Sequence, residues 1–318
     1  MIDILAGYWD ALVQLVDTGE ATTKLLLPFY LSVIFIERLG YFIGHTRYNG
    51  KDAFTSLAIS AFNTLVVGTL VAGFVFFTVY TWIYDHFRLW EMPYSWWGWV
   101  LVFLIHDLFY YTEHRLAHRV GLFWAFHHVH HSSKEFNFTT ASRGFFLDGF
   151  LTTSWIYYLT PLFGVDILQF TVIVVLTNLF GIFNHTQLVK DLGFLEYVLA
   201  TPKNHSVHHA KNVKYLDKNY GQVLILWDIL FGTFQKEDPK EKPVYGLTKD
   251  IDTFNPVKVE VAGVAWLWSQ IKSADKWKDK LNYLIQPPGW SHTGDHQRVE
   301  DMILEKQQKP LSHALSEV

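Results

Sequence analysis

Long apolar segments alternate with short polar ones over the first 190 residues of the chain. The mostly apolar segments run over about 23–44, 55–84, 96–118, 145–165 and 167–189. The second is the clearest, because TSLAISAFNTLVVGTLVAGFVFFTVYTWIY contains no charged side chain. A stretch of about 20 apolar residues is long enough to cross a bilayer as a helix. The pattern therefore predicts an all-α integral membrane protein with about four to five transmembrane helices.

The positions of Lys and Arg predict how these segments are oriented. Basic residues gather at 45–54, at 113–144 and throughout the chain after 189, whereas 85–95 has no excess of base. Short cytoplasmic loops carry the excess of Lys and Arg in membrane proteins. An odd number of spans starting outside puts every basic segment on the cytoplasmic side. Residues 1–20 then lie outside, and their four acids and absence of base are the opposite of a secretory signal peptide.

The chain beyond residue 189 mixes polar and apolar positions, so we expect it to form a cytoplasmic helical cap. Within it, YGQVLILWDILFGTF (220–234) is too short and too interrupted to span, which favours an interfacial or core helix. The stretch from about 291 has the composition of a solvated helix or a disordered tail. These differences predict membrane helices over 1–95, a central domain over 96–290 and a polar tail over 291–318.

Composition narrows the classes of function. Half of the residues are hydrophobic, 17% are aromatic and only 18% are charged, whereas soluble domains carry about 25% charged residues. The net charge of −4 leaves no basic footprint for nucleic acid. The chain has no cysteine, which excludes disulfides and thiolate metal ligands, but it has 16 histidines. A soft-metal site would have to be built from imidazole and carboxylate groups.

Most of the histidines fall in three short clusters. The first places four side chains at i, i+4, i+7 and i+11, on one face of a helix: Asp107, Tyr111, His114 and His118. The clusters HHVHH and HSVHH share the spacing H-x-x-H-H, which again puts three histidines on one face. One more histidine ends the last apolar segment. The candidate metal ligands are His114, His118, His127, His130, His131, His185, His205, His208 and His209.

These clusters predict a metal centre. A lone histidine on an apolar face is ordinarily a hydrogen-bonded core residue. Three clusters at one predicted membrane face are different, because protonated neighbours would repel one another and lose their hydration. Neutral imidazoles that share a cation avoid that cost. Nine imidazoles exceed one tetrahedral site, so two ions are expected. Imidazole suits iron and zinc alike, among other metals, so the residues leave the metal open.

Metal-bound imidazoles usually donate their other N–H group to an acceptor. The acceptors nearest to the first cluster in the sequence are its acidic and phenolic residues. We take Asp107 and Tyr111 as candidate catalytic residues beside the metal, with Glu113 and Tyr110 as further candidates.

The order HRLAH, HHVHHSS, NH and HSVHH resembles the fatty acid hydroxylase/sterol desaturase superfamily. Within it, the chain is most similar to the alkylglycerol monooxygenases, the glyceryl-ether enzymes. The similarity extends through TPKNHSVHHAKNVKYLDKNYGQVLILWDILFGTF, VYGLTKDIDTFNPVKV and QPPGW, so it covers most of residues 100–290. This resemblance implies that the central domain is catalytic and that its cytoplasmic cap holds two iron ions.

The resemblance also implies an activity, the O₂-dependent hydroxylation of a lipid C–H bond. In the glyceryl-ether enzymes tetrahydrobiopterin supplies the electrons, and the hydroxylated ether collapses to a fatty aldehyde and a glycerol derivative. Two positions depart from the pattern. The family has an acidic residue directly after H-x-x-x-H, where this chain has Arg119, and a glycine where this chain has Ala210.

Two other interpretations remain open. The first is a sterol, fatty-acid or carotenoid hydroxylase or desaturase of the same superfamily, supplied by an external electron donor. The second, of another class, is a divalent-metal transporter. Transport sites lie near the bilayer midplane, whereas these clusters fall at segment ends and in the cap, which favours the enzyme.

Overall fold

The computed structural model describes residues 27–44, 48–63, 73–147 and 154–316. Its regular structure over these ranges is helical, with β-structure confined to isolated bridges, so the predicted all-α class is confirmed. The longer helices are α2 (Leu27–Ile43), α3 (Gly50–Phe62), α4 (Gly73–Phe87), α5 (Trp96–Arg119), α6 (Gly121–His131), α8 (Ile167–Phe183), α11 (Pro256–Ser273), α12 (Trp277–Ile285) and α13 (Val299–Ser316). The short ones are η3 (Thr140–Ser142), α7 (Ser154–Tyr157), η5 (Thr160–Phe163), η6 (Gly193–Tyr197), α9 (Pro202–His208) and α10 (Leu226–Leu230).

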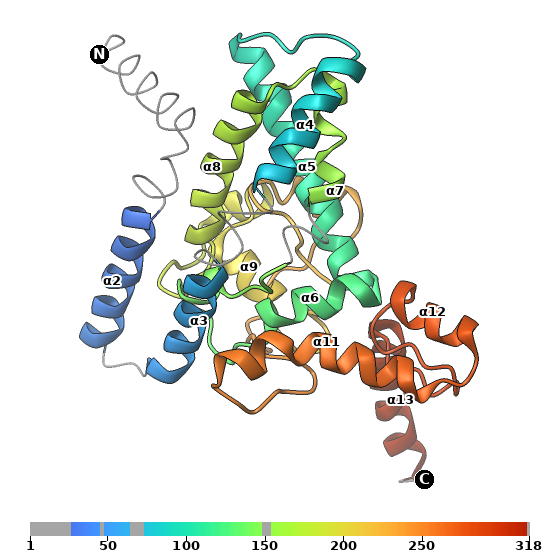
Figure 1. The fold of residues 1–318 in the computed structure, drawn as a ribbon. Helices are drawn as coiled ribbons and strands as arrows, with labels where there is room; N and C mark the ends of the chain where they lie inside the picture. The colour runs from blue at the N-terminus through green and yellow to red at the C-terminus, as the bar shows by residue number, and fades with distance from the viewer. Residues whose placement is uncertain (1–26, 45–47, 64–72, 148–153, 317–318) are drawn as a thin grey trace.

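Helices α4, α5 and α8 form the upper part of the molecule, with α7 and η5 packed against them (Figure 1). Their facing side chains make an apolar core that includes Tyr80, Tyr157 and Phe170. Helix α8 starts at Asp166, whose carboxylate accepts hydrogen bonds from the first backbone N–H groups of the helix, as a helix start requires. This bundle supports α5 along its length and leaves the C-terminal end of α5 at the lower side.

Helix α6 follows α5 after a break at Val120 and lies along α11 in the lower part of the molecule (Figure 1). Two glycines permit this close packing. A Cβ atom on Gly263 of α11 would collide with the carbonyl oxygen of Ala125 in α6. A Cβ atom on Gly121 would collide with the carbonyl oxygen of Tyr283 in α12. Because these two glycines have no side chains, α6 can pack closely against α11 and α12. Helix α6 carries three of the candidate ligands.

Most of the predicted apolar segments contain a helix. Segments 23–44, 96–118 and 167–189 contain α2, α5 and α8, and segment 55–84 contains much of α3 and α4. Residues 1–26 and 64–72, on which parts of these predictions fall, lie outside the described residues. Among the helices that the structure describes, none combines the length and the apolar character needed to cross a bilayer.

The single helix predicted over 145–165 is wrong for its described part, which forms only the short α7 and η5. Pro161 lies in the first turn of η5, and Gly164 ends it with a left-handed φ of 70°, a conformation that glycine adopts without strain. Residues 148–153 of this segment lie outside the described residues.

The region between α8 and α11 consists of loops and short helices that lie below the upper bundle (Figure 1). The helix predicted over 220–234 is confined to α10, and the rest of that stretch is irregular. The predicted tail forms α13, whose Glu300 carboxylate pairs with Arg119 at 2.5 Å and whose Lys306 pairs with Glu241 at 3.1 Å. The tail is therefore attached to the end of α5 rather than free in solvent.

Candidate metal centre

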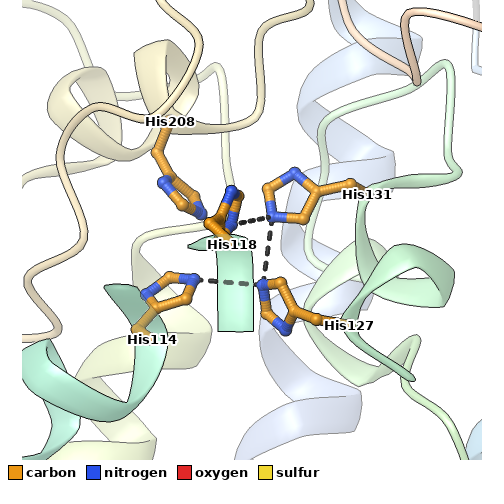
Figure 2. Close-up of side chains that lie close together, drawn as sticks. All are labelled: His114, His118, His127, His131 and His208. Carbon is orange, nitrogen blue, oxygen red and sulfur yellow. Dashed lines mark hydrogen bonds between the residues drawn. The ribbon is translucent and has the colours of Figure 1, made fainter. Parts of the chain in front are cut away.

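The nine candidate ligands lie together in two adjoining groups. The five-histidine group consists of His114, His118, His127, His131 and His208, and the four-histidine group consists of His130, His185, His205 and His209. Within each group, one ring nitrogen of every histidine lies within 4.8 Å of those of the others. Figure 2 shows the rings of the five-histidine group arriving from different elements with nitrogen atoms directed toward a common centre.

Helix periodicity divides each H-x-x-H-H motif between the two groups. In α6, the i and i+4 residues His127 and His131 belong to the five-histidine group, while the i+3 residue His130 belongs to the other. In the third cluster the division is reversed, because His205 and His209 join the four-histidine group and His208 does not. Residues i and i+4 share a helix face, so each motif presents a pair to one group and a single residue to the other.

The two groups touch each other. The ring centroids of His131 and His209 lie 4.5 Å apart, and those of His205 and His208 lie 5.2 Å apart. Within the groups, the Nε2 atoms of His114 and His127 are 3.1 Å apart, and those of His185 and His205 are 3.0 Å apart. Two cations bound in these groups would therefore be neighbours.

Backbone carbonyl groups fix the tautomer of several of these rings. The Nδ1 atoms of His114, His208, His130 and His185 each lie 2.8–2.9 Å from a carbonyl oxygen, those of Tyr220, Lys218, Arg143 and Gly181 in turn. A carbonyl oxygen only accepts hydrogen bonds, so Nδ1 must carry the proton. In a neutral ring, Nε2 is then an unprotonated lone pair that faces into the group.

The donor set fits metal ions. The Nε2 atoms of His130 and His185, both without a proton in the neutral rings, face each other at 3.4 Å. The Nε2 atom of His208 is buried and has no hydrogen-bond partner among the described residues. Buried polar atoms are almost always satisfied, and facing lone pairs repel unless a cation lies between them. This is the arrangement that metal coordination by neutral imidazoles requires.

Burial keeps the rings of His130, His131 and His208 neutral. It lowers the pKa of His131 and His208 well below the usual range, and the charges that neighbouring histidines would carry add to the effect. Burial likewise lowers the pKa of His130, to about 4. Free histidine titrates near 6.5, so at neutral pH the rings offer lone pairs rather than positive charges.

One face of α5 packs against residues 217–233, a loop that includes the short helix α10. His114 near the end of α5 contacts the carbonyl oxygen of Tyr220 in this loop. The loop is held in place by Asp228, whose carboxylate accepts hydrogen bonds from the backbone N–H groups of Tyr220 and Gly221. Burial raises the pKa of Asp228, which these hydrogen bonds oppose. The loop thus orients a candidate ligand through its backbone.

The two candidate catalytic residues lie on this same face but not beside the histidines. The carboxylate of Asp107 accepts hydrogen bonds from the backbone N–H groups of Val223 and Leu224 and from the indole N–H of Trp227. The expectation that Asp107 accepts from an imidazole is therefore corrected, since its oxygens are engaged by the loop.

The hydroxyl group of Tyr111 lies 3.0 Å from that of Thr233 and accepts a hydrogen bond from Arg115. Its ring stacks on Phe231. Asp107, Tyr111 and His114 share one face of α5, as the spacing predicts. The loop 217–233, and not the metal centre, covers the upper half of that face. Of the further candidates, Tyr110 has its ring 5.4 Å from that of His114.

Sequence reasoning missed Asp217, whose carboxylate lies beside one of the candidate ligands. Its Oδ1 lies 3.5 Å from Nδ1 of His118, and its Oδ2 accepts a hydrogen bond from Arg119 at 2.8 Å. Burial alone would raise the pKa of Asp217, but contacts with His118 and Arg119 outweigh it and hold the pKa below its usual value. Asp217 adopts a left-handed φ of 56°, and Asp is among the residues that tolerate this region.

The remaining described histidines lie in neither group. His106 is buried and stacks on Tyr157 with ring centroids 5.2 Å apart. His86 and His292 bond to Trp82 and Tyr283 away from the centre. His128 of α6 is buried on another side of the helix from its neighbours, as its helical position predicts. The side chains of His45 and His313 lie outside the described residues.

Comparison with known proteins shows which proteins these motifs resemble. Residues 99–233 match the fatty acid hydroxylase family model. The chain is 36% identical to human alkylglycerol monooxygenase over 270 residues, which is 84% of this chain and 59% of that protein. It is 38% identical to the Xenopus tropicalis alkylglycerol monooxygenase over 279 residues, 86% of this chain and 60% of that protein.

More distant relatives are similar over a shorter region. An ornithine lipid hydroxylase from Rhizobium tropici is 30% identical over 149 residues, 47% of this chain and 45% of that protein. The chain spans about three fifths of the length of the alkylglycerol monooxygenases it matches. No solved structure matches it significantly.

Proposed function

We propose that this chain, which carries a domain of the fatty acid hydroxylase family over residues 99–233, is a di-iron monooxygenase that hydroxylates a lipid C–H bond. The observation that carries the proposal is the convergence of nine buried or half-buried imidazoles in two adjoining groups. The five-histidine group would hold one iron ion and the four-histidine group the other. We extend the catalytic domain to 96–290, because α11 and α12 hold α6 in place.

Iron bound there supplies the chemistry that activates O₂ for attack on a C–H bond. The chain's own residues hold and orient the ligands. The carbonyl groups of Lys218, Tyr220 and Arg143 fix which ring nitrogen faces inward. Asp217 supports His118, and such partners raise the basicity of a metal-bound imidazole. Burial of the rings keeps bulk water from competing for the lone pairs.

The favoured substrate is an O-alkylglycerol, because relatives that are similar over the greater part of this chain carry the name alkylglycerol monooxygenase. Hydroxylation of the carbon beside the ether oxygen consumes O₂, two electrons and two protons and releases water. The resulting hemiacetal breaks its C–O bond and yields a fatty aldehyde and glycerol. Hydroxylation of a fatty acid, sterol or carotenoid is the second candidate, favoured by the similarity to other lipid hydroxylases.

Tetrahydrobiopterin is the favoured electron donor, and an external redox protein is the alternative. The substitution of Arg119 for an acidic residue does not leave an isolated positive charge. Its guanidinium pairs with Asp217 and with Glu300 of α13. The region beside His118 therefore retains carboxylates, supplied by other parts of the chain.

We also propose that the protein is integral to a membrane, with the metal centre on its cytoplasmic side. Large apolar side chains lie exposed along α2 and around the ends of α4 and α5, including Phe35, Phe42, Trp82, Trp90 and Trp96. Phe42 is 78% exposed and Trp96 is 79% exposed. Soluble monomers rarely expose apolar patches of this kind, whereas a lipid environment covers them.

The test is turnover by the purified, iron-loaded chain with O₂ and 1-O-hexadecylglycerol. Reactions with tetrahydrobiopterin and with reduced ferredoxin or cytochrome are compared, and mass spectrometry detects hexadecanal. Aldehyde formation supports the ether-lipid assignment whichever donor is used. Conversion of a fatty acid or sterol, with no aldehyde from the ether, would refute that substrate and leave the di-iron proposal standing. A chain that binds no iron would refute both.

A further inference from the structure

The two histidine groups have different neighbours. Three ligands of the five-histidine group line an open cavity of about 630 Å³, whose other walls come from α6, α11, the start of α13 and nearby loops. Among the described residues of the four-histidine group, His209 alone reaches this cavity. Segment 133–143, the stretch of chain that follows α6, lies against the four-histidine group instead.

Segment 133–143 contacts every ring of the four-histidine group. The phenyl ring of Phe136 lies against three of them, with ring centroids 5.2–6.1 Å apart. At the end of the segment, the carbonyl oxygen of Arg143 lies 2.9 Å from Nδ1 of the fourth, His130. The position of this segment therefore decides how the four rings are oriented.

We propose that helices α2 and α3 complete the metal centre through two buried carboxyl groups, Glu37 and Asp52, which hold segment 133–143 against the four-histidine group. Both are positioning residues, because they act on the histidines through other residues. The inference rests on the proposed two-metal centre. It goes beyond that centre by assigning a role to helices that lie outside residues 99–233, the region that matches the family model.

Helix α2 turns a polar side toward the protein. Tyr30, Glu37 and Tyr41 are buried and lie at i, i+7 and i+11, on one face of the helix. Phe35 and Phe42 point away from that face and are 69% and 78% exposed. A carboxyl group is costly to bury unless it has hydrogen-bond partners, so the contacts of Glu37 explain its position.

Glu37 is fully buried and joins two parts of the metal centre. Its Oε2 atom accepts a hydrogen bond from the backbone N–H group of Phe138 at 2.8 Å. Its Oε1 atom accepts one from the hydroxyl group of Thr186 at 2.6 Å. Thr186 directly follows the candidate ligand His185. Glu37 therefore ties the middle of segment 133–143 to the residue beside a ligand.

Neighbouring side chains hold the same backbone. The hydroxyl group of Tyr30 donates a hydrogen bond to the carbonyl oxygen of Phe138 at 3.1 Å. The amide group of Gln187 donates to the carbonyl oxygen of Phe136 at 2.9 Å and to the hydroxyl group of Tyr41 at 3.2 Å. The backbone on both sides of the phenyl wall is thus fixed by hydrogen bonds that involve α2.

Asp52 of α3 holds both ends of segment 133–143. Its Oδ2 atom accepts a hydrogen bond from the hydroxyl group of Ser133 at 2.6 Å, and its Oδ1 atom accepts one from the guanidinium group of Arg143 at 3.0 Å. The side chains of Asp52 and Arg143 are only 4% and 2% exposed. Loss of one partner would leave an uncompensated buried charge. Because the carbonyl group of Arg143 fixes the tautomer of His130, Asp52 acts on this ligand through one residue.

The five-histidine group is supported from within residues 99–233. The carbonyl groups of Tyr220 and Lys218 and the carboxylate of Asp217 contact its rings. Removal of a carboxyl group from α2 or α3 should therefore affect one histidine group selectively, whereas a general folding defect would affect both.

The test is titration of the metal-free chain in lipid nanodiscs with Co²⁺, whose visible absorption reports coordination by imidazole. The wild type should show two binding steps, and the step that His185→Ala weakens is that of the four-histidine group. We compare Glu37→Gln and Asp52→Asn with Glu91→Gln. Glu91 is the matched control, because its carboxylate is 72% exposed and pairs with Arg88.

We expect Glu37→Gln and Asp52→Asn to weaken the step of the four-histidine group by about 10–100-fold, the usual range for loss of a partner that orients a ligand. Glu37→Gln leaves one acceptor oxygen for two donors, and Asp52→Asn leaves Arg143 without a counter-charge. The other step should stay within about twofold of wild type, and Glu91→Gln should change neither. Asp52→Asn combined with Arg143→Gln removes both charges and should bind more tightly than Asp52→Asn alone.

Equal weakening of both steps would indicate a general folding defect and would overturn the inference, as would two steps that remain like those of wild type in Glu37→Gln and Asp52→Asn. A double variant that binds no better than Asp52→Asn would exclude the ion pair as the cause.

Turnover separates this inference from the proposed function. Selective weakening of one Co²⁺ step, in a chain whose iron form oxidises no lipid with any donor, would sink the proposed monooxygenase and leave the positioning role standing. Lipid oxidation by a chain whose two steps do not respond to Glu37→Gln or Asp52→Asn would sink the inference alone.

Discussion

The two histidine groups lie side by side yet differ in their surroundings. Three of the five-histidine ligands line the open cavity, and one of them, His118, lies beside the carboxylate of Asp217. The four-histidine group has a fully buried phenyl ring against it instead, since the ring centroid of Phe136 lies 5.2 Å from that of His209 and 5.7 Å from that of His185. Three ligands of the five-histidine group therefore face a polar, accessible space, whereas the four-histidine group reaches that space only through His209 and has an apolar wall against it.

This difference indicates that the two histidine groups have different roles. A carboxylate partner makes an imidazole a stronger ligand, and an open cavity lets small molecules approach. An apolar wall excludes water and lowers the local dielectric, which strengthens electrostatic interactions inside. We therefore expect electrons to enter on the side of the five-histidine group, while the four-histidine group depends more on packing for its integrity.

The largest expected effect comes from removing a ligand. His208→Ala and His185→Ala should both abolish turnover, because a methyl group cannot replace an imidazole nitrogen. Their metal contents should differ. His208→Ala leaves four histidines in its group, enough for a tetrahedral site, whereas His185→Ala leaves three. Iron analysis by mass spectrometry should show a greater loss for His185→Ala.

His128→Ala is the matched control, since it removes a buried histidine of α6 that belongs to neither group. It should retain the iron content of wild type. Wild-type turnover by His208→Ala or His185→Ala would contradict the ligand assignment, and equal iron loss in both would remove the expected difference between the groups.

Acidification should weaken the feature that the groups share, their neutral rings. Burial lowers the pKa of His130 to about 4, whereas an unfolded histidine titrates near 6.5. Below 6.5 the unfolded chain binds more protons than the folded one. The contribution of this histidine to stability is therefore complete above about pH 6.5 and declines as the pH falls toward 4. Protons also compete with metal for the same lone pairs.

Iron retained after dialysis at pH 7.5, 6 and 4.5 should decrease in that order, and thermal unfolding should shift downward in parallel. A metal content that is independent of pH over this range would show that the imidazoles are not the ligands.

A smaller effect is expected from Asp217→Asn, which keeps the shape of the side chain but removes its charge. The affinity of the five-histidine group for metal should fall by about 10–100-fold, the usual range for loss of such a partner. Competition with a chelator measures this, and ⁵⁷Fe Mössbauer spectra distinguish the two ions. The four-histidine group should be unaffected.

Arg119→Gln should give a weaker version of the same change, because Arg119 acts on the centre through Asp217. Arg119→Lys should restore part of the loss. An effect of Arg119→Gln larger than that of Asp217→Asn would show that Arg119 has a direct role of its own.

The smallest expected effect is that of Phe136→Leu. Shape changes of buried apolar residues typically cost about 1 kcal/mol of stability, and here the change should accelerate metal loss from the four-histidine group only. Phe194→Leu, at a 73% exposed position, is the control and should change neither. Faster loss from the five-histidine group would break the proposed separation of the two environments.

The sequence predicts the converging histidines well because helix periodicity decides which of them share a face. Spacing alone places His127 with His131 and His205 with His209. It cannot assign His130 and His208 to opposite groups, because that division depends on how α6 and α9 face each other in the fold. The helices over 96–118 and 167–189 were likewise predictable from unbroken apolar runs.

The predictions from the sequence fail where the backbone is irregular. Asp107 and Tyr111 share the face of His114, but the loop 217–233 reaches them first. In that loop, Asp217 and Asn219 adopt left-handed backbone conformations, with φ of 56° and 57°. No periodic pattern in the sequence predicts such turns. The sequence therefore does not predict which acidic residue contacts His118. The structure identifies it as Asp217.

The central claim is that the histidines hold two metal ions, and the most direct test is the metal stoichiometry of the purified chain. Inductively coupled plasma mass spectrometry, on protein expressed with iron and quantified by amino-acid analysis, should give two iron ions per chain. One ion or none per chain, in protein that retains its helical circular dichroism spectrum, would contradict the account.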